Sequence, residues 1–246
     1  MQTGRFGRRL AYSGLTLAVV CVIAAMLSGF GYQAGLWHFR TGFLVLRTVF
    51  FVSLGAGVLS ILGILFSRGT RSALVSGIAG LVIALGFAYV PWQWKQTLDA
   101  LPYIHDISTD TENPPQFVAA AQLRREGDHP VAYDGPDVAT EQKKAYPDIV
   151  PVMFQAPKDR VFEAARQSIQ DMDLQLTGAD LAQGRLEASH TSFWYGFTDD
   201  MVVRITQTAQ GARVDVRSKS RVGRSDLGQN ARRVRSFIAH LESRLN

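Results

Sequence analysis

The first 98 residues contain no Asp or Glu and hold three long apolar segments, 10–30, 43–66 and 73–92. Each segment is close to the ~20 residues with which an α-helix crosses ~30 Å of hydrocarbon. A helix also satisfies its own backbone hydrogen bonds in lipid, where water is absent. We therefore expect three transmembrane helices. The first apolar run is long for a cleaved signal peptide, so we expect that helix to be retained.

Charge is divided unevenly along the chain. Eight bases and no acid lie in residues 1–98, whereas all 21 acids lie in 99–246 beside 18 bases, which gives that part a net charge of 18 − 21 = −3. The overall charge of +5 thus comes from arginines that flank apolar segments. Such arginines are typical of membrane topology, and we expect no binding of nucleic acid.

The flanking bases also predict orientation. One side of the membrane would carry Arg5, Arg8, Arg9, Arg68 and Arg71, and the other side Arg40 and Lys95. Positive residues favour the cytoplasm. We expect a multi-pass inner-membrane protein with a cytoplasmic N-terminus and a periplasmic C-terminal domain.

Composition divides the chain into three parts: a transmembrane region (1–95), an acidic, proline-rich collar (96–146) and a folded domain (147–246). All nine prolines lie between Pro91 and Pro157, and residues 99–148 carry ten acids against four bases. Such a composition favours an irregular linker over a packed core, with one short helix expected at 117–126.

The domain combines the periodicities of strands and helices. Extended or alternating residues in 148–156, 173–178, 184–192, 200–208 and 212–221 predict strands. Apolar residues at helical spacing in 157–172 and 225–245 predict two amphipathic helices. This order predicts an α+β fold after the three-helix transmembrane bundle. Its sheet would be antiparallel, with the helices on one face.

Several stretches together carry a family resemblance: "PYIHDISTDTENPPQF", "YPDI", "GRLEA", "YGFTDDMVVRI" and "RVDVRSKSRVGRSDLGQNARRVRSF". Over residues 99–246 the chain resembles the domain of unknown function 1499 family, in a membrane-anchored bacterial form. The resemblance implies no activity. It does imply that the collar packs on the domain.

The collar motif contains polar side chains that could bind a metal ion or act in catalysis. It comprises Tyr103, His105, Asp106, Asp110, Pro114, Pro115 and Phe117. The spacing of its acids and histidine matches neither a calcium loop nor a zinc site. We expect these residues to be structural, as turn residues and caps. We predict no metal and no cofactor.

Catalytic residues are not apparent, and we assign none. The sequence has no nucleophile motif, and its one cysteine, Cys21, lies in the first apolar segment. A hydrolase-like enzyme of the envelope remains an alternative. It would use Glu187, Asp199 or Asp200 with His105 or His190, and it requires these side chains to converge.

A basic strand face is the other candidate site. Alternation places Arg213, Asp215, Arg217, Lys219 and Arg221 together, and Arg204, Arg224 and Ser225 complete the ligand-binding set that we predict, along with Glu187, Asp199 and Asp200. This face would bind an anionic group, or it is simply solvated. The favoured function is an envelope module that binds an anionic lipid, a small ligand or a protein partner.

Overall fold

A computed structural model describes residues 2–67 and 69–245. Arg68, one of the arginines used to predict orientation, lies outside the described residues. Contacts divide the chain into two units, each described by itself. One comprises Met1–Thr97 with Phe193–Gly196, and the other Leu98–Ser192 with Phe197–Asn246. The collar therefore groups mostly with the folded domain.

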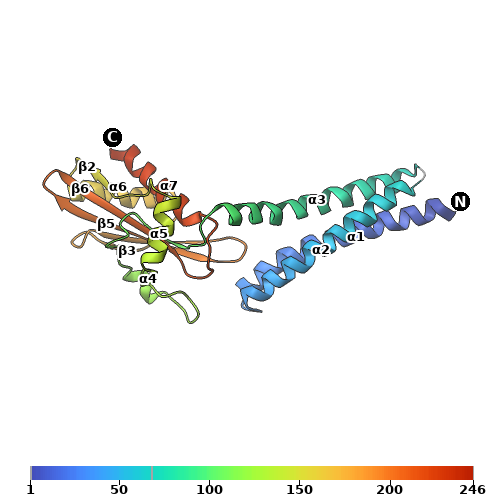
Figure 1. Cartoon of the computed structure of the whole chain (residues 1–246), viewed down its shortest axis with the longest axis horizontal. Helices are drawn as coiled ribbons and strands as arrows, with labels where there is room; N and C mark the ends of the chain where they lie inside the picture. The colour runs from blue at the N-terminus through green and yellow to red at the C-terminus, as the bar shows by residue number, and fades with distance from the viewer. Residues whose placement is uncertain (1, 68, 246) are drawn as a thin grey trace. The chain divides into compact units, whose positions relative to one another are not determined.

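The first unit contains three helices that are long and apolar enough to span a membrane: α1 (Gln2–Gln33), α2 (Phe39–Leu65) and α3 (Arg71–Ala100) (Figure 1). Small residues on these helices allow their backbones to approach closely. A Cβ added to Gly63 would lie 2.4 Å from the backbone nitrogen of Ala11. Helix α3 extends well beyond the predicted segment and contains Pro91.

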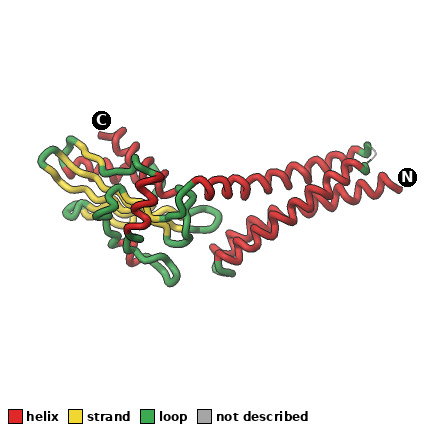
Figure 2. Tube along the Cα trace, viewed as in Figure 1, coloured by secondary structure: helices red, strands yellow, loops and turns green. Residues whose placement is uncertain are grey.

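The second unit is an α+β domain, as predicted, with a six-stranded antiparallel sheet (Figure 2). Its strands are β1 (Asp106–Ser108), β2 (Val152–Phe154), β3 (Gln175–Asp180), β4 (Arg185–Thr191), β5 (Thr198–Thr208) and β6 (Gly211–Ser220). The strand order is β1-β6-β5-β4-β3, and β2 also pairs with β6.

One face of this sheet forms the main core with two amphipathic helices, α6 (Lys158–Asp171) and α7 (Gln229–Leu245). Leu186, Val203 and Val216 lie on three adjacent strands, and their side chains are fully buried in this core. Because successive side chains of a strand point to opposite faces, the polar residues between them point away from these helices.

The collar is not the irregular linker that its composition favours. Strand β1 pairs with β6, and a second helix, α5 (Pro136–Ala145), was missed. The predicted helix at 117–126 is reduced to α4 (Ala119–Gln122). Gln142 of α5 both accepts from and donates to the backbone of Ser108, at 3.0 and 2.7 Å. This reciprocal pairing ties α5 to β1 across a long sequence separation.

Candidate functional site

The sheet face opposite α6 and α7 is lined with charged side chains, and the collar covers it. Arg217 and Lys219 of β6 are fully buried, and Asp215 is 1% exposed. Alternation correctly places these residues on one face. The expectation that this face is solvated is wrong for Arg217 and Lys219, because carboxylates of the collar already pair with both side chains.

The innermost ion pair joins β1 to β6. Arg217 donates from Nε and Nη2 to the two carboxylate oxygens of Asp106, at 2.9 and 2.8 Å. Both side chains are fully buried. Lys219 Nζ lies 3.2 Å from Asp106 Oδ2 and donates to Asp134 at 2.6 Å. Two parallel hydrogen bonds make such a pair geometrically specific.

Arg217 also holds neighbouring collar segments. Its guanidinium donates to the carbonyl oxygens of Pro115 and Val131, at 3.2 and 2.9 Å. The same group lies 4.9 Å from the centre of the Phe117 ring, within reach of a cation–π interaction. Pro115 and Phe117 of the collar motif thus contact the buried cation, whereas Tyr103 is exposed.

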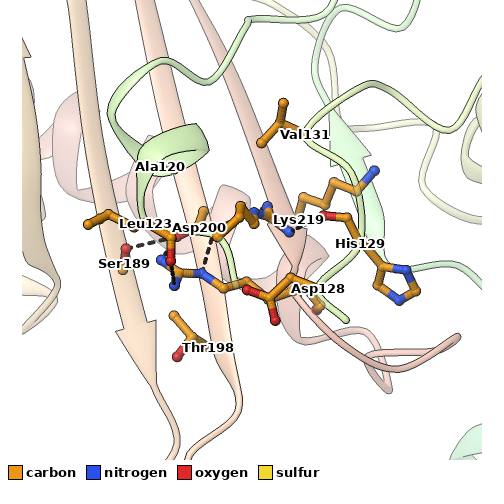
Figure 3. A network of polar contacts seen from close by, with 12 residues as sticks. Ala120, Leu123, Asp128, His129, Val131, Ser189, Thr198, Asp200 and Lys219 are labelled. Atoms are coloured by element: carbon orange, nitrogen blue, oxygen red, sulfur yellow. Dashed lines mark hydrogen bonds and ion pairs between the residues drawn. The ribbon is translucent and has the colours of Figure 1, made fainter. Parts of the chain in front are cut away.

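A second cluster surrounds Asp200 of β5, which is fully buried (Figure 3). Asp200 accepts from Ser189 Oγ at 2.8 Å and from Arg221 Nε and Nη2 at 3.0 and 2.8 Å. Arg124 Nη2 is 3.0 Å from Asp200 Oδ2, without the alignment of a hydrogen bond. Burial lowers the pKa of Arg124, and the charge of Asp200 partly offsets this effect.

A third cluster joins the collar to β5 and β6 at Asp110. Its Oδ2 lies 3.2 Å from Arg204 Nη2 and 2.7 Å from Arg213 Nη2. Both arginines also donate to Asp215. In addition, Asp110 Oδ1 accepts from the backbone N–H groups of Glu112 and Asn113. Asp110 therefore forms a turn and holds that turn against the sheet.

Glu187 of β4 caps helix α4. Its carboxylate accepts from the backbone N–H groups of Val118, Ala119 and Ala120 at 2.9, 3.0 and 2.9 Å. Glu187 is 1% exposed, and Arg185 Nε lies 3.3 Å from it. These contacts use both oxygens of the carboxylate in structural roles.

His190 and Asp199 lie apart from Glu187 and Asp200. The register pairs His190 with Asp199 and Ser189 with Asp200. His190 and Asp199 therefore point to the sheet face opposite that of Glu187 and Asp200. His190 is exposed, and Asp199 accepts from Arg233 of α7 at 2.8 Å. The hydrolase hypothesis requires His190 to lie close to Glu187 and Asp200. The sheet places His190 on the opposite face from both.

His105 occupies a different place in the collar. Its ring stacks on that of His129, with 4.2 Å between the ring centres, and its Nε2 lies 3.3 Å from Asp134 Oδ2. Burial lowers the pKa of His105 despite the nearby charge of Asp134. His129 contacts the residue that follows β6, because its backbone N–H donates to Arg221 O at 2.6 Å. The pair thus fastens the collar.

Two further predicted residues, Arg224 and Ser225, precede α7. Arg224 lies over the ring of Tyr103, 5.6 Å from its centre. Ser225 Oγ accepts a long hydrogen bond of 3.4 Å from Leu227 N. The capping carboxylate is Asp226, which accepts from the N–H groups of Gly228 and Asn230 at 2.8 and 2.7 Å. Asp226 therefore occupies the N-terminal end of α7. Pro114 accepts from Gln116 at 2.9 Å.

An open groove that the sequence did not indicate lies beside β2. It has a volume of about 490 Å³ and is lined by Val152, Met153, Phe154, Gln155, Ala156, Arg160, Glu242 and Leu245. A smaller hollow of about 420 Å³ shares its residues from Met153 to Gln155 and adds Gln210. Met153 and nearby Val150 are each 53% exposed. The apolar run around Pro151 was the available signal, but it only predicted a strand.

Within residues 2–67 and 69–245, no group of three or more His, Cys, Asp or Glu side chains is arranged to hold a metal ion. The features above define a protein with three membrane-length helices and an α+β domain whose charged face is closed by a collar. Residues 106–241 match the family model described as a protein of unknown function (DUF1499), and the chain belongs to that family. No curated protein matches the chain.

Proposed function

We propose that this protein is a membrane-anchored binding module. Three helices hold the α+β domain at the outer surface of the inner membrane, and the groove beside β2 receives a small ligand or a segment of an envelope protein. One observation carries this proposal. Carboxylates suited to acid–base chemistry are held in ion pairs and caps, whereas the groove is open and lined by exposed Met153.

The groove has the composition of a binding surface. Its lining combines the apolar residues Met153 and Leu245 with the polar side chains of Gln155, Arg160 and Glu242, so a ligand would meet both kinds of contact. Met153 has a flexible thioether side chain that adapts to different partners. Strand β2 also lies beside β6 at one side of the sheet, where an extended segment of a partner can add.

The orientation rests on the flanking bases of the helices. Arg5, Arg8, Arg9 and Arg71 belong to one side by sequence, and Arg40 and Lys95 to the other. This bias supports a cytoplasmic N-terminus. Three spans then carry the domain outward. An anionic lipid remains a candidate partner, but its binding at Arg217 or Lys219 needs the collar to leave the sheet.

Native mass spectrometry of the full-length protein in detergent tests the proposal. We expect a bound species that is retained by the variant Leu181→Glu, at an exposed position in the turn between β3 and β4, and lost from Met153→Glu. Retention of that species by Met153→Glu would exclude the groove as its site. The hydrolase hypothesis instead predicts turnover of model esters by wild type, abolished in a folded Asp200→Asn variant.

A further inference from the structure

The tip of the hairpin between β4 and β5 is strongly aromatic. Residues Phe193–Gly196 group with the three helices, although the strands on either side belong to the other unit. Phe193 is 83% exposed, the largest exposed fraction among the exposed large hydrophobic side chains. Residues 191–198, "TSFWYGFT", contain no charged side chain. The proposed binding function explains none of these features.

Trp194 and Tyr195 lie against the end of α1. Trp194 Nε1 donates to the carbonyl of Met26 at 3.0 Å, and the hydroxyl of Tyr195 lies 3.0 Å from Ser28 Oγ. A Cβ added to Gly29 would come within 2.5 Å of the Trp194 ring. Glycine at this position therefore leaves the space that the indole fills.

The surroundings of the tip are aromatic as well. Phe193 meets Phe30 edge to face, with 5.6 Å between ring centres, and Tyr195 lies 5.3 Å from Phe43. Trp37, in the loop after α1, donates from Nε1 to Ser28 O at 3.0 Å. Aromatic side chains with an apolar body and a polar edge concentrate at the membrane–water interface. This end of α1 and α2 has that character.

We infer that residues 193–196 form a lipid-facing anchor, in which Trp194 and Tyr195 rest on α1 and the side chain of Phe193 enters the interfacial layer of the bilayer. The number of spans permits this arrangement. With three spans, the loop between α1 and α2 and the chain after α3 lie on the same side of the membrane. The tip therefore reaches the ends of α1 and α2 without crossing it.

Fluorescence quenching in proteoliposomes tests the lipid contact. In the full chain with Cys21→Ala, a single cysteine is introduced by Phe193→Cys and labelled with an environment-sensitive fluorophore. Leu181→Cys is the matched control, because Leu181 is 45% exposed at the opposite end of β4. We expect the emission of the fluorophore at position 193 to shift to the blue and to be quenched by nitroxide-labelled phospholipid. The fluorophore at position 181 should show neither effect. Equal quenching at both sites, or an aqueous spectrum at 193, would overturn the anchor.

Disulfide cross-linking tests the seat, which is the contact of Trp194 with α1, independently of the lipid contact. A Cβ at Gly29 would lie 2.9 Å from the carbonyl oxygen of Trp194, so the pair Gly29→Cys and Trp194→Cys is close enough to cross-link. Gly35→Cys with Trp194→Cys is the control, because no atom of the described residues lies within 4 Å of a Cβ added at Gly35. We expect a mobility shift under non-reducing conditions for the first pair alone. A cross-link without quenching at 193 would retain the seat and refute the lipid contact.

Discussion

Replacement of Arg217 by Met should destabilise the domain severely. Methionine retains an apolar side chain, but Asp106 loses its bidentate partner and keeps the ion pair with Lys219, and the carbonyls of Pro115 and Val131 lose a donor. Removing one partner of a buried ion pair costs about 3–5 kcal/mol. Native domains have only about 5–15 kcal/mol in total. At about 2–4 °C per kcal/mol, the midpoint of unfolding should fall by on the order of 10 °C.

Arg235→Met is the matched control. Arg235 makes the same bidentate contact, to Asp148 at 2.6 and 2.7 Å, but its side chain is 42% exposed. Exposed pairs contribute about 0–1 kcal/mol. Proteolysis of the full chain at rising temperature, with cleavage sites located by mass spectrometry, would report on residues 98–246. All four tryptophans lie in the other unit, so their fluorescence would not.

Equal midpoints for the two variants would refute the conclusion that the Arg217 pair is buried and structural. The double variant Asp106→Leu with Arg217→Met adds a second check. Removing both charges avoids a buried carboxylate that has lost its bidentate partner, so the double variant should be more stable than Arg217→Met alone. A double variant that loses the sum of both single effects would show that the two side chains do not interact.

Three further outcomes are expected. Glu187→Gln should speed hydrogen exchange of the amides at 118–120, since an amide group cannot accept all three N–H bonds, while exchange in α6 stays unchanged. Because burial lowers the pKa of His105, the folded state disfavours its protonated form, and stability should decline as pH falls below the unfolded pKa of about 6.5. His105→Asn should reduce this slope, and His190→Asn, at an exposed site, should not. Gly63→Leu should lower the yield of folded protein in membranes and Gly55→Leu should not, because no atom in the described parts of the chain lies within 4 Å of a Cβ at Gly55.

The sequence predicted the elements whose signal is periodic. Three uninterrupted apolar runs predicted α1, α2 and α3, and alternation predicted β4, β5, β6 and the shared face of Arg213, Arg217 and Lys219. Both signals are local. A strand at period 2 and an amphipathic helix at period 3.6 each show within about ten residues which side is buried.

The collar was mispredicted because its stability comes from distant partners. Asp106 and Arg217 are 111 residues apart, and Glu187 caps backbone N–H groups about 68 positions away. Composition describes such a segment as acidic and poor in apolar residues, and so predicts a linker. Distance in sequence also explains the error about the basic face, since only the fold shows that acids of the collar pair with its arginine and lysine side chains. The family resemblance pointed the right way by implying that the collar packs on the domain.

We propose that three spans carry the folded domain to the side of the membrane opposite the N-terminus. Alkaline phosphatase, which is active only outside the cytoplasm, tests it when fused to truncated chains in a bacterial host. We predict an active fusion after Leu98 and an inactive fusion after Arg71, because the bases at the N-terminus and between α2 and α3 favour the cytoplasm. Activity after Arg71 with none after Leu98 would place the domain in the cytoplasm and overturn this topology.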